Sequence, residues 1–147
     1  GDTHFCLGIN GKQSEFNAAM GLANFAHLDE IIEKRKNISN LYNELLQNVV
    51  ERPKQQEGLV HNYAYYPVLF KSEEELLKVF EALNKENIYP RRYFYPSLNS
   101  LPYLNEYQKC PISEDVSLRI ACLPLYPALD LKDVTRIAET IKAAING

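Results

Sequence analysis

The chain has 147 residues, of which 46% are hydrophobic and 24% are charged, with a formal net charge of -3. This mild acidity, without a basic block, gives no electrostatic reason to expect a nucleic acid or an anionic membrane as a partner. No apolar run approaches the length of a membrane span.

The cysteines and histidines are too scattered to suggest a metal or redox site. They are Cys6, Cys110, Cys122, His4, His27 and His61. The three cysteines are odd in number, and neither set has the spacing of zinc ligands or of a redox pair. We therefore expect no bound metal, reduced thiols and a cytoplasmic location.

The chain opens on a loop that leads directly into a helix. The first ten residues, GDTHFCLGIN, show neither a helix cap nor alternation, and we interpret them as a loop inside a longer chain. Ser14 is the expected N-cap of the helix, and Glu15 lies near the positive end of its dipole. From Leu28 the apolar residues recur at three and four positions, which predicts a long amphipathic helix to about Val49.

The first half of this helix, from Phe16 to Ala26, is unusual because apolar and mostly small residues surround its axis. A helix that is apolar on nearly all sides is buried on nearly all sides. We expect it to pack on a partner, which is the missing part of its own chain, another subunit, or both.

The rest of the chain predicts a small α+β unit, in which a short, mostly antiparallel sheet is covered by helices. We expect a strand over residues 59–70, a helix from the capping box of Ser72 and Glu75 to Asn87, and an extended segment over 88–96. Residues 98–113 are expected to be irregular with one helical turn. A further strand over 116–124 and a last helix from Asp130 to Gly147 complete the order.

Two segments carry candidate binding residues. In GINGK, residues 8–12, the side chains of Asn10 and Lys12 lie just before a helix N-terminus, where anions are favoured, so a phosphate contact is reasonable. The alternative is that Gly8 and Gly11 merely form turns.

The second segment is PRRYFYPSLN, residues 90–99. Arg91 and Arg92 offer planar donors for phosphates or carboxylates, and Tyr93, Phe94 and Tyr95 offer stacking faces. This composition suits a nucleotide or a sugar, although alternation along the segment would place some of these residues in a core.

Three blocks together resemble the sugar aminotransferases of the DegT/DnrJ/EryC1/StrS family, which use pyridoxal phosphate and have fold type I. The blocks are GINGKQSEFNAAMGLANFAHLDEIIEKR, RRYFYPSLNSLPYL and LRIACLPLYPALDLKDVTRI. The resemblance implies that residues 1–147 are the C-terminal domain of such an enzyme and that residues 1–13 are a loop left from the preceding large domain.

The resemblance also implies roles for individual residues. Asn10 would contact the cofactor phosphate of the partner subunit in a homodimer, and Lys12 stands where many relatives have arginine. The sugar-nucleotide side would be lined by residues of the second segment: Arg91, Arg92, Tyr93, Tyr95 and Asn99. Asn99 stands where many relatives have histidine.

The function implied is transfer of an amino group from an amino acid, usually glutamate, to a keto-deoxysugar attached to a nucleotide. The Schiff-base lysine would lie before Gly1, so the chain holds no catalytic residue and is expected to be inactive alone, without bound pyridoxal phosphate. The alternative is a stand-alone module that binds a sugar or dimerises and has no chemistry.

Overall fold

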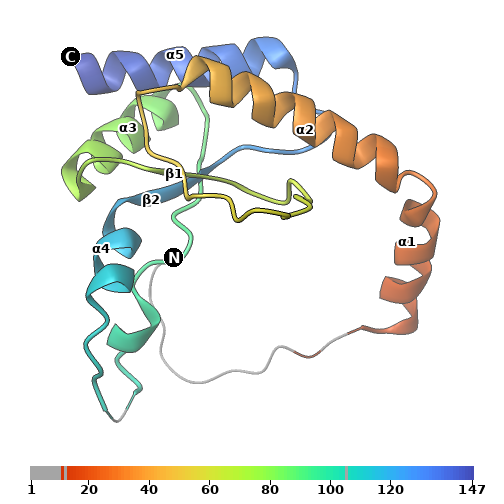
Figure 1. Cartoon of the computed structure of the whole chain (residues 1–147), viewed down its shortest axis with the longest axis horizontal. Coiled ribbons are helices and arrows are strands. Elements are labelled where there is room, and N and C mark those ends of the chain that lie inside the picture. The colour runs from red at the N-terminus through yellow and green to blue at the C-terminus, as the bar shows by residue number, and fades with distance from the viewer. Residues whose placement is uncertain (1–10, 12, 105) are drawn as a thin grey trace.

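The computed structural model describes Gly11, residues 13–104 and residues 106–147. In chain order its elements are α1 (Glu15–Phe25), α2 (Leu28–Leu45), β1 (Tyr66–Leu69), α3 (Glu73–Lys85), the short 3-10 helix η1 (Leu98–Ser100), α4 (Pro111–Arg119), β2 (Ile120–Leu123) and α5 (Leu131–Asn146). The two strands form one antiparallel sheet, so the predicted α+β class is confirmed. Helices α2, α3 and α5 lie together on one side of this sheet (Figure 1).

The sheet has one buried face and one open face. Tyr66 of β1 lies opposite Leu123 of β2, and Val68 lies opposite Ala121. These four side chains are at most 4% exposed, because alternate residues of each strand point toward the helices. The residues between them, such as Cys122, are only half-buried. We call the face that carries Cys122 the open face.

The hydrophobic core lies between the buried face and the three helices. Tyr42 from α2, Val79 from α3 and Ile141 from α5 are each 0% exposed. Fully burying a large apolar side chain contributes about 1.5–3 kcal/mol, so these contacts hold the helices on the sheet. The Tyr42 hydroxyl also donates to the carbonyl of Pro124 at 3.2 Å, which ties α2 to the chain just after β2.

The predicted helix starts are confirmed by their caps. The Ser14 Oγ accepts from the backbone N–H of Asn17 at 3.4 Å, and the Ser72 Oγ accepts from that of Glu75 at 3.2 Å. The carboxylate of Asp130 accepts from the N–H of Lys132 at 3.0 Å. Each cap satisfies a backbone donor that has no partner inside its helix.

The long first helix of the sequence prediction is divided in two. The side-chain amide of Asn24 donates to the carbonyl of Met20 at 2.8 Å, and the N–H of His27 bonds to the carbonyl of Asn24 three residues back. These contacts interrupt the regular pattern of bonds four residues apart, and the axis changes direction between α1 and α2 (Figure 1). Helix α2 ends at Leu45, before a left-handed residue, Asn48, at φ 62°.

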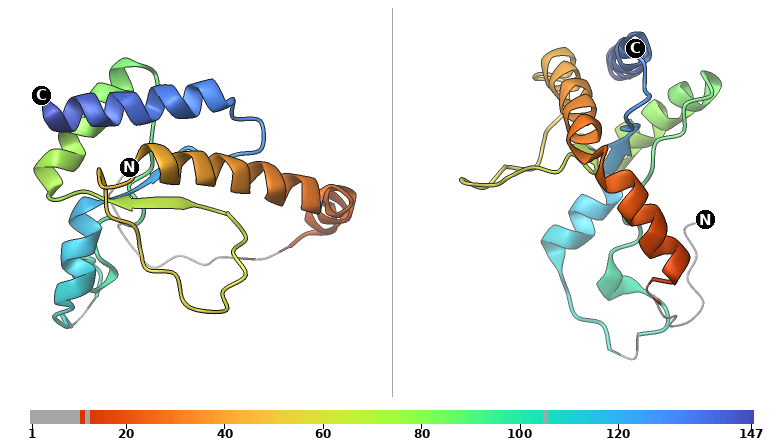
Figure 2. Two further views of the ribbon diagram at one scale, coloured as in Figure 1. Left: turned by 45° about the horizontal axis from the view of Figure 1, so that its top comes forward. Right: turned by 90° about the vertical axis from the view of Figure 1, so that its right-hand side faces the viewer.

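Helix α1 projects from the core with no cover from the described part of the chain. All of its residues are exposed, including Phe16 at 84%, Leu22 at 79% and Phe25 at 72%. Both views of Figure 2 show it beyond the end of α2, away from α3 and α5. The expectation that this segment needs a partner outside its own core therefore stays a prediction.

Most of the predicted strand over 59–70 is wrong, since only Tyr66–Leu69 is a strand. In the preceding loop the His61 Nδ1 accepts from the N–H of Tyr63 at 2.8 Å, and the Asn62 Oδ1 accepts from that of Ala64 at 3.1 Å. Such local bonds compete with a strand ladder. Tyr63 also has φ 51°, which no strand accommodates.

Residues 116–119 were predicted as strand but form the end of α4. Pro111 suits the first turn of a helix, and Arg119 pairs with Asp115 four residues earlier at 2.8 Å. Segment 88–96 was predicted to be extended, but it turns at Tyr93 and Phe94 and joins the sheet only through an isolated bridge between Arg91 and Cys122. Pro90 and Pro96 limit the ladder of this segment, because proline has no N–H to donate.

Two adjacent leucines of α3 test the one-sided core. Leu76 is 0% exposed and Leu77 is 50% exposed. Leu76→Ala should lower the free energy of unfolding by about 2–5 kcal/mol. Leu77→Ala, the matched control, should change it by no more than about 0.5 kcal/mol. Denaturant unfolding of the chain measures both, and equal losses would contradict the packing described.

Candidate functional site

The candidate binding segment 90–99 is fixed to the edge of the sheet by its backbone. The N–H of Arg91 donates to the carbonyl of Cys122 at 3.1 Å, and the N–H of Cys122 donates back at 2.8 Å. This pair places Arg91 beside the end of β2. From there the segment runs to η1 and α4.

The residues of this segment divide into two groups. Arg91 donates through Nη1 to the hydroxyl of Tyr93 at 3.3 Å. The Tyr93 ring centroid lies 5.4 Å from that of Tyr65 and 4.6 Å from that of Phe94. Tyr65 is 52% exposed and Phe94 is 69% exposed, so the group remains accessible. We call Tyr65, Arg91, Tyr93 and Phe94 the aromatic–arginine cluster.

Arg92, in contrast, is held inside the chain. Its Nη2 donates to the carboxylate of Glu73 on α3 and, at 3.0 Å, to the carbonyl of Leu118 on α4. Its guanidinium lies 3.5 Å from the ring centroid of Tyr95, and its side chain is 12% exposed. Arg92 and Tyr95 therefore join α3, α4 and the segment. They lie on either side of the turn at Tyr93 and Phe94.

Asn99 is also engaged within the chain. Its side-chain amide donates to the carbonyl of Gln108 at 2.8 Å and to Oε1 of Glu114 at 2.6 Å. Its Oδ1 accepts from the hydroxyl of Ser97 at 2.5 Å. An asparagine amide has two hydrogens to donate, so both are already used. Asn99 thus closes the loop between η1 and α4.

Glu114 is the centre of this loop. Its Oε1 also accepts from the backbone N–H of Cys110 at 2.8 Å and from the hydroxyl of Tyr107 at 2.7 Å. The Cys110 N–H, followed by the Tyr107 and Asn99 donors, holds the pKa of the Glu114 carboxyl below its usual value. The negative charge of Glu114 therefore organises a loop of more than ten residues.

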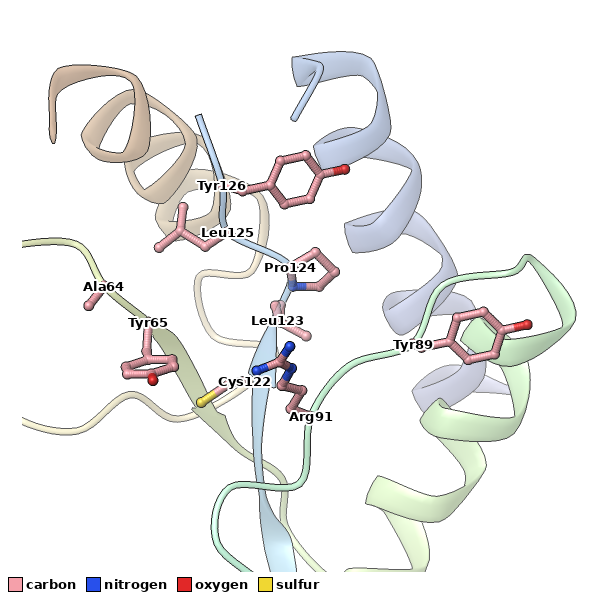
Figure 3. Close-up of a pocket in the computed structure, with 9 residues that line it drawn as sticks. All are labelled: Ala64, Tyr65, Tyr89, Arg91, Cys122, Leu123, Pro124, Leu125 and Tyr126. Atoms are coloured by element: carbon pink, nitrogen blue, oxygen red, sulfur yellow. The ribbon is translucent and has the colours of Figure 1, made fainter. Parts of the chain in front are cut away.

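A cavity of about 390 Å³ adjoins the aromatic–arginine cluster. Its walls come from the start of β1, the segment after α3 and the end of β2 (Figure 3). Burial raises the pKa of the Cys122 thiol in its wall, so this group is neutral. The cavity lies within the size range of small-molecule sites.

Sequence reasoning missed Tyr65 and Glu114. Tyr65 was read as part of a continuous strand, and nothing local shows that its ring lies beside Tyr93, which is 28 residues away by the sequence numbers. Glu114 carried a weak signal, because it follows Pro111 in the first turn of α4. The sequence prediction had no helix there, since it placed an irregular stretch over 98–113 and a strand over 116–124. Asn10 and Lys12, the candidate phosphate contacts, lie outside the described residues.

No described lysine is buried. Lys34, Lys36, Lys85 and Lys132 each lie within ion-pair distance of a carboxylate. The same part of the chain holds no group of three or more His, Cys, Asp or Glu that could bind a metal ion. None of its helices is long and apolar enough to cross a membrane.

Comparison with solved structures defines the class of protein. The fold is similar to part of the crystal structure of DesI in the presence of its TDP-sugar product, with a TM-score of 0.80 and 28% identity. The match covers 95% of this chain and 38% of that one. The sequence model of the DegT/DnrJ/EryC1/StrS aminotransferase family matches residues 2–142, and the chain belongs to this family.

Two curated relatives show which members of the family the chain is similar to. A dTDP-4-amino-4,6-dideoxy-D-glucose transaminase of Escherichia coli is 34% identical over 147 residues, covering 91% of this chain and 38% of the relative. A GDP-perosamine synthase of Escherichia coli O157:H7 is 30% identical over 138 residues, covering 94% of this chain and 38% of the relative. The chain therefore spans well under half the length of the relatives it matches.

The loop around Glu114 predicts a pH-dependent contribution to stability. Because the pKa of Glu114 is lowered in the folded state, its stabilisation is complete above the unfolded pKa of about 4.3 and is lost as the pH falls through the folded value. Glu114→Gln cannot ionise. The difference in Tm between wild type and Glu114→Gln should be largest at neutral pH and shrink below about pH 4.

The matched control is Glu106→Gln, which changes an exposed carboxylate of the same loop. Thermal unfolding followed across the acid range measures all three proteins. A difference for Glu114→Gln that stays constant down to about pH 2 would show that charge plays no part in holding the loop.

Proposed function

We propose that the protein containing this chain transfers an amino group from an amino acid, with glutamate the expected donor, to a keto-deoxysugar linked to a nucleotide. The observation that carries the proposal is the aromatic–arginine cluster, exposed beside a cavity on a chain of this aminotransferase family. An arginine next to stacking rings suits a phosphate-bearing aromatic ligand. The two relatives named above bear the names of enzymes of nucleotide-linked amino sugars.

The proposal treats residues 1–147 as the C-terminal domain of the enzyme, with residues 1–13 a loop that joins it to a large domain. The cofactor, pyridoxal phosphate, would supply the electron sink for the transfer. The described lysines, which are exposed or half-buried, do not offer the desolvated amine that attaches it. The large domain would therefore provide that lysine, and this chain alone would be inactive and carry no covalently bound cofactor.

The described residues would act by binding and positioning. Arg91 and Tyr93 are proposed to face the sugar nucleotide. Arg92, Tyr95 and Asn99, which sequence reasoning also assigned to this side, would support them, because their polar groups are occupied within the chain. The protein is proposed to act as a homodimer in the cytoplasm, without nucleic acid or membrane partners.

A stand-alone module that dimerises or binds a sugar without chemistry is the second candidate. The exposed apolar side chains of α1 favour it, because such a helix can associate two copies. The full-length protein, incubated with pyridoxal phosphate, glutamate and a panel of nucleotide-linked 3-keto and 4-keto sugars, decides between them. Amino-sugar formation supports the enzyme, and its absence with every substrate would contradict it.

Asn10 provides a test of the homodimer. Asn10 is proposed to donate a hydrogen bond to the cofactor phosphate. Because Asn10→Ala removes that hydrogen bond, it should weaken cofactor binding about tenfold to a hundredfold. The test uses a heterodimer of an Asn10→Ala protomer and a protomer that lacks the Schiff-base lysine. A contact from the partner subunit would leave one site with both an intact lysine and an intact Asn10, and this site should bind the cofactor with wild-type affinity. Titration of the purified heterodimer with cofactor measures this, and a weakened titration would assign the contact to the same subunit.

A further inference from the structure

The stretch that contains η1 and α4 lies outside the hydrophobic core. We call its described part, residues 97–104 and 106–119, the arm. None of these residues belongs to the core cluster between the sheet and helices α2, α3 and α5. Leu101 is nonetheless only 6% exposed, so the arm buries an apolar side chain of its own. The arm lies on the side of the sheet opposite to α2 and α5, which is the side of the open face (Figure 1).

Polar contacts hold the two sides of the arm together. The Ser97 hydroxyl lies 2.7 Å from that of Ser113, and the Asn99 amide donates to Oε1 of Glu114 at 2.6 Å. The Ser117 hydroxyl donates to the carbonyl of Glu114 at 2.9 Å. These bonds connect η1 with α4 and none of them reaches the core, so the arm is a structural unit of its own.

The arm contacts the rest of the described chain at its base, where α4 runs into β2. All hydrogen bonds found between the arm and the other residues of 13–104 and 106–147 lie there. The N–H of Phe70 donates to the carbonyl of Arg119 at 3.0 Å, and the Arg119 Nη1 donates back to the carbonyl of Phe70 at 3.0 Å. The Arg92 Nη2 donates to the carbonyl of Leu118 at 3.0 Å.

Arg92 links this base to α3. The same Nη2 that donates to Leu118 of the arm also donates to the carboxylate of Glu73, in the first turn of α3. The Arg92 side chain is 12% exposed, and charge-assisted hydrogen bonds are stronger than neutral ones. The other chain connection of the arm enters beside the same strand, through the backbone pair of Arg91 and Cys122. Both connections are thus at one end of the arm, which is the arrangement of a hinge.

We propose that the arm is a movable lid beside the open face of the sheet, and that the ion pair between Arg92 and Glu73 is the latch that holds it in place. When the latch opens, the arm rotates about its base as a rigid body, because the bonds around Glu114 do not cross that base. The inference goes beyond the proposed function and does not depend on it, since neither the lid nor the latch is assigned a substrate.

The variant Glu73→Gln in the full-length protein tests the latch by amide hydrogen exchange. The N–H of Phe70, which crosses the base, should exchange about tenfold faster, because the lid loses the support of a charge-assisted hydrogen bond. The amides of α4 should keep wild-type protection, because the arm stays folded while it moves. Glu74→Gln, the matched control, removes the neighbouring exposed carboxylate from the same first turn of α3 and should change neither.

Pulsed EPR distances measure the position of the lid directly. Spin labels are attached through non-natural amino acids at two exposed positions, Ile112 of α4 and Glu139 of α5, so that the cysteines stay unlabelled. Wild type and Glu74→Gln should give one narrow distance, and Glu73→Gln should add a second population. Arg92→Met removes the other half of the latch and should produce the same second population.

Two results would overturn the lid. One is a distance and a Phe70 exchange rate that stay at wild-type values when the latch is removed. The other is faster exchange throughout α4 in Glu73→Gln, which would mean that the arm unfolds instead of moving as a body. Both results leave the proposed function standing, because neither measurement involves transamination.

Discussion

The one-sided burial of a two-stranded sheet is the constraint on which the rest of the structure depends. Two strands alone are marginally stable, and here α2, α3 and α5 supply a full layer of apolar side chains to a single face. This core is complete without α1 and without the open face. Those two surfaces are therefore free to contact whatever the rest of the protein provides, in keeping with a chain that spans 38% of its relatives' length.

The open face carries the candidate site because of how segment 90–99 is attached. The backbone pair between Arg91 and Cys122 fixes one end, and the loop organised by Glu114 fixes the other. Between these points the chain turns at Tyr93 and Phe94, so neighbouring side chains point in different directions. Arg92 turns inward to Glu73 and becomes structural, whereas Arg91 stays exposed. The two adjacent arginines thus have different roles because of their positions: Arg92 is structural and Arg91 is exposed at the candidate site.

The sequence was informative where the signals are local. Caps at Ser14, Ser72 and Asp130 located three helix starts. It misled over 59–65 because tyrosines favour strands, and local side-chain bonds were not foreseen. The sequence did not predict contacts between distant segments, such as that of Tyr65 with Tyr93, because local patterns carry no information about which segments meet in space.

The central claim is that this chain completes one face of its core and leaves α1 and the open face to the rest of the protein. Amide hydrogen exchange, measured on the chain alone and on the full-length protein, tests this most directly. We expect the amides of α3 and α5 to be protected in both, and those of α1 to be protected only in the full-length protein. Equal protection of α1 in both samples would contradict the account.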